Sequence, residues 1–177
     1  MSSTLYSLRR RFPVLRPDHR VRTMLERAGF TGAELDLLAR HGRIVSFSEG
    51  APLARIGGHE RRLLLLLEGS ARATRADGDG SLLEGSFTNP DIVGEISVFG
   101  SRHYQVADVL AVTQVIAIEF PLSSGQLLSS SAPRLMSIVG DRSAPRLASL
   151  EAAAQARRAE SRDRLGVYFE ALDRVRS

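Results

Sequence analysis

The stretch Asp-Ile-Val-Gly-Glu-Ile-Ser-Val-Phe, residues 91–99, lies in the middle of a region built from short apolar segments. From Arg43 onward these segments alternate with breaks that contain glycine. This rhythm is typical of an antiparallel roll or barrel of short strands. The predicted strands are 44–47, 62–68, 71–75, 82–87, 106–111 and 114–119.

Two local patterns within this region support the interpretation. Asp77-Gly78-Asp79-Gly80 predicts a hairpin turn, because glycine tolerates the positive φ that such turns require. The uninterrupted apolar run 63–67 has no polar alternation, so it predicts a strand that is buried on both faces, with a helix as the alternative.

Helical patterns flank the strand region on its N-terminal side. Apolar residues at helical spacing predict a short helix over 19–28. Thr31 is then a predicted N-cap, and Glu34 completes a capping box three residues later. We expect this second helix to end at Gly42.

Helical patterns also follow the strand region. Pro133 fits the first turn of a long helix over 134–158, which we expect Gly140 and Pro145 to kink or interrupt. The further predicted elements are one or two turns over 123–128 and a last amphipathic helix that Ser161 caps, over 161–175.

The fold class is therefore predicted to be α+β: a jelly-roll-like antiparallel β-roll between N-terminal helices and a long C-terminal helix. The basic N-terminal arm is interpreted as a solvated tail, with contact to an acidic partner or nucleic acid, or an organelle presequence, as alternatives. The expected parts are the arm 1–20, the first helices and roll 21–122, the helices 123–160, and the short helix 161–177.

The composition excludes several chemistries. The chain of 177 residues contains no cysteine, and its 24 basic residues are all arginine. Disulfides, thiolate metal sites, Schiff-base lysines and a Walker-type phosphate lysine are therefore excluded. A net charge of +4 permits association with nucleic acid without demonstrating it. The absence of cysteine and of a long apolar run predicts a cytoplasmic protein that does not span a membrane.

The sequence contains no pattern of catalytic or metal-binding residues. The four histidines lack the spacing of metal ligands, and Ser97 does not lie in the Gly-x-Ser-x-Gly motif of hydrolases. Glu49, Glu84 and Asp91 are acidic residues to which the sequence assigns no catalytic partner. We predict that the protein is not an enzyme and has no catalytic residue and no metal site.

The run Gly-Glu-aliphatic-small-aliphatic-aromatic over 94–99 resembles the phosphate-binding cassette of cyclic-nucleotide-binding domains. The family is that of the catabolite activator (Crp/Fnr) regulators, and the resemblance extends from Phe30 to Val175. It implies that the backbone of Gly94 approaches the ligand and that Glu95 accepts the ribose 2′-hydroxyl. It further implies that the amide groups of Ile96 and Ser97 face the cyclic phosphate.

The cassette departs from the family pattern at its arginine. The register that preserves Ala107 and Val109 places Gln105 at the position of the phosphate-binding arginine, with Val106 next to it. The missing charge-assisted bond is worth about 1.5–3 kcal/mol. Arg102 is the candidate substitute, with His103 beside it, and the alternative is that Arg102 faces solvent.

A second departure lies in the long helix. In the best-studied members of the family, hydroxyl residues on this helix contact the purine. The corresponding positions here hold Leu150 and Glu151, which do not reproduce a Thr-Ser pair. Three readings of the pocket remain open: it binds a different small effector, it binds cAMP or another cyclic nucleotide weakly, or it binds nothing.

The resemblance implies a homodimer that pairs through the long helix, with Leu147, Leu150 and Ala154 at the seam; the alternative is that this face packs on its own roll. The leading hypothesis is the ligand-sensing and dimerisation domain of a Crp/Fnr-type transcriptional regulator. A ligand-free scaffold and a stand-alone nucleotide-binding regulator of another protein are the alternatives. DNA binding is expected only through a C-terminal domain outside this sequence, and we expect a truncated regulator or a natural stand-alone sensor.

Overall fold

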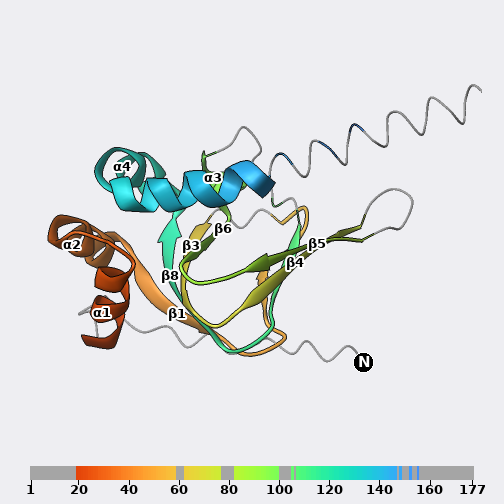
Figure 1. The fold of residues 1–177 in the computed structure, drawn as a ribbon, viewed down its shortest axis with the longest axis horizontal. Coiled ribbons are helices and arrows are strands. Elements are labelled where there is room, and N and C mark those ends of the chain that lie inside the picture. The colour runs from red at the N-terminus through yellow and green to blue at the C-terminus, as the bar shows by residue number, and fades with distance from the viewer. Residues whose placement is uncertain are drawn as a thin grey trace, which may run out of the picture. The chain divides into compact units, whose positions relative to one another are not determined.

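A computed structural model describes residues 19–58, 62–76, 82–99, 105, 107–146, 148, 152 and 155. The chain divides into two compact units, Met1–Arg142 and Ser143–Ser177. The described residues of the second unit are all helical. The first unit contains the strands and the N-terminal helices (Figure 1).

Two four-stranded antiparallel sheets form the roll. The first sheet has the order β1-β8-β3-β6, comprising Arg43–Phe47, Val115–Pro121, Arg62–Glu68 and Asp91–Val93. The second has the order β2-β7-β4-β5, comprising Pro52–Ala54, Asp108–Ala111, Ala71–Ala76 and Leu82–Phe87. The predicted jelly-roll-like fold is thereby confirmed.

Strand β3 separates two hydrophobic cores. Leu63, Leu65 and Leu67 point toward the helices and pack in one cluster, whereas Leu64 and Leu66 point into the roll and pack in the other. Successive side chains of a strand alternate between faces, so a strand covered on both sides needs apolar residues at every position. The prediction that 63–67 is a doubly buried strand is confirmed.

Helices cover one face of the first sheet (Figure 1). On the N-terminal side, α1 spans His19–Arg27 and α2 spans Gly32–His41. After the last strand, η1 spans Leu122–Ser124 and α4 spans Gly125–Ser131. A further helix spans 133–146. The capping box is confirmed, since the Thr31 hydroxyl accepts from the Glu34 amide and the Glu34 side chain accepts from the Thr31 amide. The C-cap of α2 is Gly42, as predicted.

Glu34 also holds the start of a distant helix. Its Oε2 accepts hydrogen bonds from the Thr31 amide and hydroxyl, both at 2.9 Å, and its Oε1 accepts from the Arg134 amide at 2.6 Å. The Arg134 Nε in turn donates to the Ala28 carbonyl at 2.6 Å. One buried carboxylate therefore satisfies free amides at the N-termini of two helices, which otherwise lack intrahelical partners.

Several predicted boundaries were wrong. The three-residue strands β2 and β6 were not predicted, because such short segments show no periodicity. β7 begins at Asp108 instead of residue 106. The helix over 133–146 runs without interruption through Gly140 and Pro145. A glycine inside a helix costs only about 1 kcal/mol, and the burial of the neighbouring Ile138 and Val139 offsets that cost.

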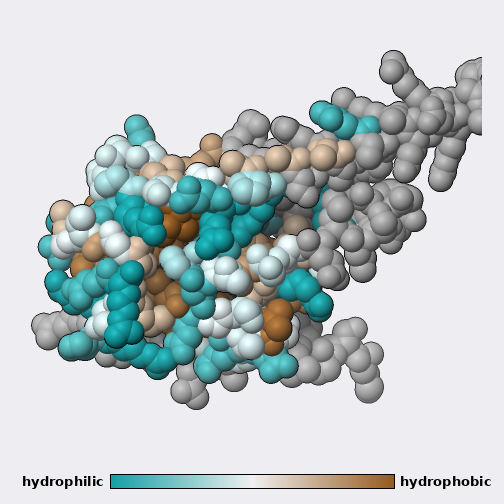
Figure 2. Space-filling model, viewed as in Figure 1, coloured by the Kyte–Doolittle hydropathy of each residue, from teal (hydrophilic) through white to brown (hydrophobic). Residues whose placement is uncertain are grey.

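The described surface has no large apolar area on the face shown in Figure 2, where hydrophobic residues form small separate patches. Among the described residues, the large apolar side chains with substantial exposure are Ile56, Leu110, Val112 and Leu127. None of the helices in the described ranges has the length and apolar character needed to cross a membrane. Isolated exposed apolar side chains of this kind are normal for globular proteins.

Candidate functional site

The cassette begins where β6 leaves the first sheet. Val93 pairs with Leu64 of β3, the backbone then turns at Gly94 with φ +95°, and the short helix α3 (Glu95–Phe99) follows. A Cβ atom on Gly94 would overlap the carbonyl oxygen of Arg62. Both the positive φ and this close approach require glycine. Residues 94–97 thus form a turn and a helical start.

Three polar side chains of this region are buried. Glu95 is 6% exposed, Ser97 is 2% exposed and Gln105 is 7% exposed. The Ser97 hydroxyl donates to the Gly94 carbonyl at 2.8 Å, and the Gln105 Nε2 donates to the Ser97 Oγ at 3.1 Å. The structure therefore brings Gly94, Ser97 and Gln105 together, although the sequence predicted no bond between the two side chains.

The backbone of Gln105 is also fixed. Its carbonyl accepts from the Gly57 amide at 2.9 Å, and its amide donates to the Gly58 carbonyl at 3.2 Å. Gly57 has φ +69°, which lets the loop after β2 turn toward Gln105. Gln105 is thus held by the loop on one side and by the cassette on the other.

A charged cluster that the sequence analysis missed lies inside the roll at the same end of β3. Arg62 and Glu119 are each 7% exposed, and their inward positions follow from the alternation along β3 and β8. The Arg62 Nη1 lies 3.4 Å from the Glu119 Oε1, and its Nη2 donates to the Leu53 carbonyl at 2.9 Å. Its guanidinium also lies 5.9 Å from the centre of the Phe47 ring.

Glu119 binds a second arginine at the rim of the roll. The Nε and Nη2 of Arg43 both lie 3.0 Å from the Glu119 Oε2. Burial by itself would raise the pKa of Glu119, but the hydrogen bonds and charges of Arg43 and Arg62 outweigh it and lower the pKa below its ordinary value. The signal in the sequence was an acidic residue within the apolar strand 115–120.

Acid should weaken this part of the fold. Burial also raises the pKa of Glu34, but hydrogen bonds from Thr31 and Arg134 bring it below its ordinary value. Both glutamates therefore bind protons more weakly in the folded state than in the unfolded state. Their contribution to the free energy of unfolding is fully present above the pKa of a glutamate in the unfolded chain, about 4.3. This contribution is lost as the pH falls through the lowered pKa values of the folded state.

We accordingly expect the free energy of unfolding, measured by urea denaturation, to fall as the pH is lowered from about 5. In the Glu119→Gln variant the same series should show a shallower decline. If the free energies of unfolding of the wild type and of Glu119→Gln fell in parallel with pH, the assignment of this pH dependence to Glu119 would be contradicted.

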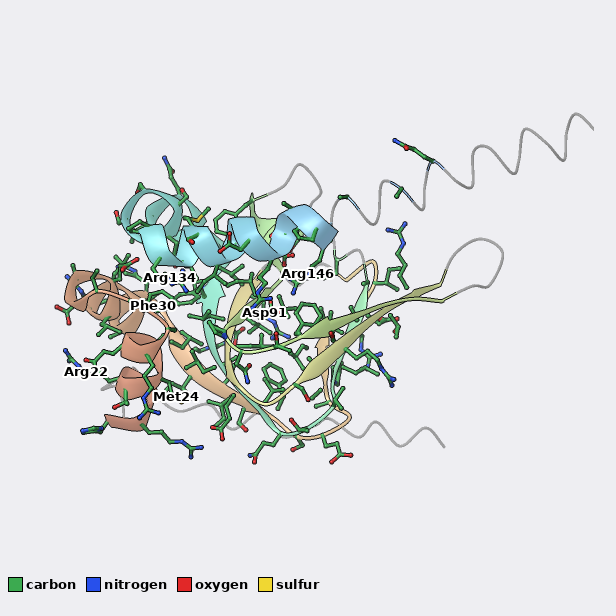
Figure 3. All side chains as sticks on the ribbon, viewed as in Figure 1. Arg22, Met24, Phe30, Asp91, Arg134 and Arg146 are labelled. Carbon is green, nitrogen blue, oxygen red and sulfur yellow. The ribbon has the colours of Figure 1, made fainter. Side chains whose placement is uncertain are left out.

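Of the other acidic residues named from the sequence, Asp91 and Glu49 have described side chains. Asp91 is 1% exposed and accepts hydrogen bonds from the amides of Ile92 and Thr88, at 2.7 and 3.3 Å, so it stabilises the turn before β6. Figure 3 labels Asp91 in the strand region and Arg134 in the helical layer. Glu49 is exposed. No cluster of metal-ligand residues occurs within the described ranges.

Some predicted site residues lie outside the described residues. They are Arg102, His103, Val106, Leu147, Leu150 and Ala154. The substitute phosphate contact and the dimer seam therefore stay predictions. Ile96 is described and is partly buried in α3.

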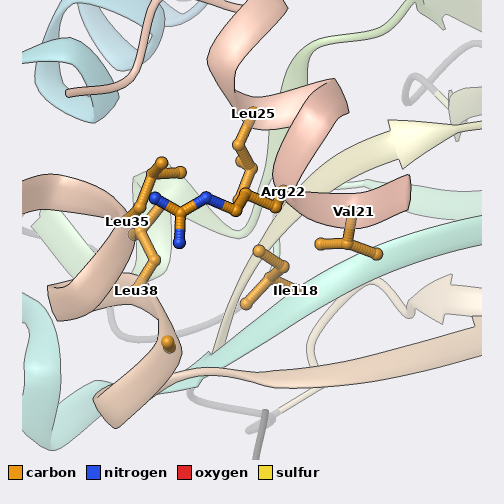
Figure 4. A pocket seen from close by; sticks show the side chains of 7 residues that line it. Val21, Arg22, Leu25, Leu35, Leu38 and Ile118 are labelled. Carbon is orange, nitrogen blue, oxygen red and sulfur yellow. The ribbon is translucent and has the colours of Figure 1, made fainter. Parts of the chain in front are cut away.

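A small apolar pocket lies away from the cassette, between α1, α2 and β8 (Figure 4). Its volume is about 10 Å³, and its lining includes Val21, Leu25, Leu35, Leu38 and Ile118. A space of this size holds about one water molecule and is too small for an organic effector. This pocket is therefore not a candidate site for an organic ligand.

Comparison with known proteins gives the class of the domain. The family model of the cyclic nucleotide-binding domain matches residues 44–128, which include the cassette and all of the roll except Arg43. This part of the chain belongs to the cyclic nucleotide-binding domain family. No curated protein matches the sequence significantly.

Solved structures of regulatory proteins share the fold. The c-di-GMP responsive global regulator CLP of Xanthomonas campestris matches with a TM-score of 0.56 and 23% identity, over 66% of this chain and 58% of that one. The catabolite activator protein of Thermus thermophilus matches with a TM-score of 0.57 and 19% identity, over 70% and 58% of the two chains. The described fold is thus shared with these two regulatory proteins.

A third similar structure is a mutant regulatory subunit of a cAMP-independent protein kinase A from Trypanosoma brucei, bound to cAMP in its A site. Its TM-score is 0.54 and its identity is 27%, over 66% of this chain and 43% of that one. The chain therefore spans about half of the length of each of these relatives.

Proposed function

We propose that the chain is the ligand-sensing domain of a regulatory protein of the Crp/Fnr type. It binds a small nucleotide-like effector at the cassette, and the helix that starts at residue 133 transmits the occupancy of the site. The observation that carries the proposal is the turn at Gly94, which places the buried Glu95 directly after β6. A carboxylate in this position can accept hydrogen bonds from hydroxyl groups, as a residue that binds ribose must do.

The effector need not be cAMP. The arginine position of the cassette holds the neutral Gln105, whose amide binds Ser97. The Trypanosoma brucei regulatory subunit without these mutations is described as part of a cAMP-independent kinase. The form that is bound to cAMP is a triple mutant, and one of its substitutions introduces an arginine. This supports a sensor whose ligand differs from that of the cAMP receptors.

The regulatory output is proposed to pass through a homodimer formed by the long helix, with Leu147, Leu150 and Ala154 at the seam. Ligand contacts that differ between two arrangements of the helix would shift the population of those arrangements. Contact with DNA would then require a C-terminal domain outside this sequence. A ligand-free dimerisation scaffold and a stand-alone regulator of another protein are the alternative functions.

The test is isothermal titration of the purified chain with cAMP, cGMP, adenosine and guanosine. For any of these that binds, the Glu95→Ala variant should bind about 1–3 kcal/mol more weakly, because a hydrogen bond to a charged acceptor is lost. Glu49→Ala is the matched control, since Glu49 is exposed and far from β6 in the sequence, and it should leave the affinity unchanged.

Two results would count against the proposal. Absent or millimolar binding of all four compounds would favour the scaffold. Equal affinities of Glu95→Ala and wild type would place the site elsewhere. Circular dichroism of each variant separates a loss of binding from a loss of folding.

A further inference from the structure

Exposed apolar side chains lie together on the outer face of the second sheet. Three of the four large apolar side chains with substantial exposure among the described residues belong to this part of the roll: Ile56 at 48%, Leu110 at 40% and Val112 at 46%. Taken singly, each of them is normal for a protein surface, whereas a contiguous group marks a surface that binds a partner.

The strand β7 places these side chains in one row. The two residues that flank Leu110 pack inside the roll, so the alternation along the strand turns Leu110 outward. Val112 lies two positions later, directly after the strand. Ile56 lies beside Asp108, two positions earlier, because its amide donates to the Asp108 carboxylate at 2.9 Å. We call Ile56, Leu110 and Val112 the β7 row.

The neighbouring strands widen this surface. Pro52 of β2 lies opposite Leu110 on one side, and Arg72 of β4 lies opposite it on the other. Arg72 is exposed and contributes an aliphatic stem as well as a charge. Pro52 has no backbone N–H, so a strand added at the edge of β2 would lack a hydrogen bond there. A partner is therefore expected to cover the face of the sheet instead of extending its edge.

Charges of opposite sign lie at the two ends of the β7 row. Arg55 is exposed and directly precedes the first member of the row in the chain. Glu49 is exposed at the far end, because the amide of the next residue, Gly50, donates to the Ala111 carbonyl at 2.9 Å. Leu110 lies between the two ends.

This arrangement is complementary to a copy of itself. In an interface with two-fold symmetry, each surface meets the same surface of the other chain, so every contact occurs twice. A two-fold axis at Leu110 brings the two Leu110 side chains together and sets Arg55 of each copy opposite Glu49 of the other. Apolar contacts at the centre and charges at the rim are the usual anatomy of an interface between proteins.

We infer that the β7 row is an interface between two copies of this chain, in which Arg55 of each copy pairs with Glu49 of the other. The inference goes beyond the proposed function and uses other residues than the seam proposed for the long helix. The row is short, so the association is weak.

The first test measures the molecular mass of the chain by analytical ultracentrifugation at concentrations up to about 1 mM, because small interfaces are weak. The mass should double across the series, whether the species at low concentration is a monomer or a dimer that pairs elsewhere. Leu110→Asp should weaken this association at least about tenfold, because it sets two carboxylates against each other at the centre. Leu127→Asp is the matched control, since Leu127 is the fourth exposed apolar side chain and lies on α4.

The second test reverses the charges at the two ends. Arg55→Glu and Glu49→Arg should each weaken the self-association, because each sets like charges opposite one another twice. Mixed in equal amounts, the two variants should associate again, since one then carries acidic and the other basic residues at both ends. Asp36→Arg, an exposed position on α2, is the control and should leave the association unchanged.

Thermal denaturation establishes that each variant is folded before the mass is measured. If Leu110→Asp does not fold, the two charge variants still decide the outcome. A wild-type mass that stays constant to the highest concentration would overturn the inference, and would leave the row to another protein or to residues 1–18. Equal weakening by Leu110→Asp and Leu127→Asp would place the contact elsewhere. A mixture of the charge variants that fails to associate would overturn the two-fold arrangement.

Discussion

Replacing Glu119 with alanine is expected to lower the free energy of unfolding by about 3–5 kcal/mol, as is typical when one partner of a buried ion pair is removed. Glu119 lies inside the roll and contacts Arg62 on β3 and Arg43 on β1. Without it, the guanidinium of Arg62, which is 9% exposed in its side chain, would remain in the interior facing a cavity. Urea denaturation followed by circular dichroism measures the effect.

The matched control is Glu68→Ala, because Glu68 forms an ion pair with Arg20 in which both side chains are substantially exposed. Solvent-exposed pairs of this kind contribute about 0–1 kcal/mol. A double variant, Arg62→Met with Glu119→Leu, should recover most of the lost stability, since apolar residues of similar volume often replace a buried pair without loss. If Glu119→Ala cost no more than Glu68→Ala, the cluster would have no role in holding the roll.

Replacing Glu34 with alanine should lower the free energy of unfolding by about 1.5–5 kcal/mol. The loss of a cap accounts for about 0.5–2 kcal/mol, and a buried amide left without a partner costs about 1–3 kcal/mol more. Glu34 is 2% exposed and binds both the Thr31 amide and the Arg134 amide. The variant therefore loosens α2 and the start of the helix over 133–146 together.

Hydrogen exchange gives the more specific readout of this variant. The amide of Arg134 should lose protection along with that of Thr31, although Arg134 lies 100 positions after Glu34 in the chain. Glu26→Ala is the control, because Glu26 forms an exposed ion pair with Arg22 one turn earlier in α1. A fall in protection at Thr31 alone would mean that Glu34 acts only as a local cap.

Much of the local structure could be predicted. The capping box of α2 needs only residues 31 and 34, and its geometry follows from the backbone of a single helical turn. The strand β3 needs only its unbroken apolar run, and β5 was predicted at its observed bounds. These elements depend on residues that are close together in the sequence, so a stretch of a few residues is enough to predict each of them.

The short strands and the long-range contacts could not be predicted in the same way. β2 and β6 exist because β7 and β3 offer them backbone partners, and three residues carry no period of their own. The third hydrogen bond of Glu34 joins it to Arg134, and no local pattern in the sequence indicates that partner. Asp91, which the sequence allowed as an acid or base, caps a turn in the folded chain.

By itself, the sequence predicted an antiparallel roll with a glycine turn followed by an acidic residue. Composition and short-range patterns suffice for this prediction, because propensity, turns and caps act over a few residues. The assignment of Gln105 to the arginine position of the cassette comes from the family resemblance and stays a prediction. Only the tertiary structure decided that Gln105 binds Ser97 and that Arg62 faces Glu119. The pair of Arg62 and Glu119 arises where β3 pairs with β8, because the register between the strands places residues that are distant in the chain at one end of the roll. The contact of Gln105 with Ser97 depends on the loop after β2, whose Gly57 and Gly58 hold the backbone of Gln105.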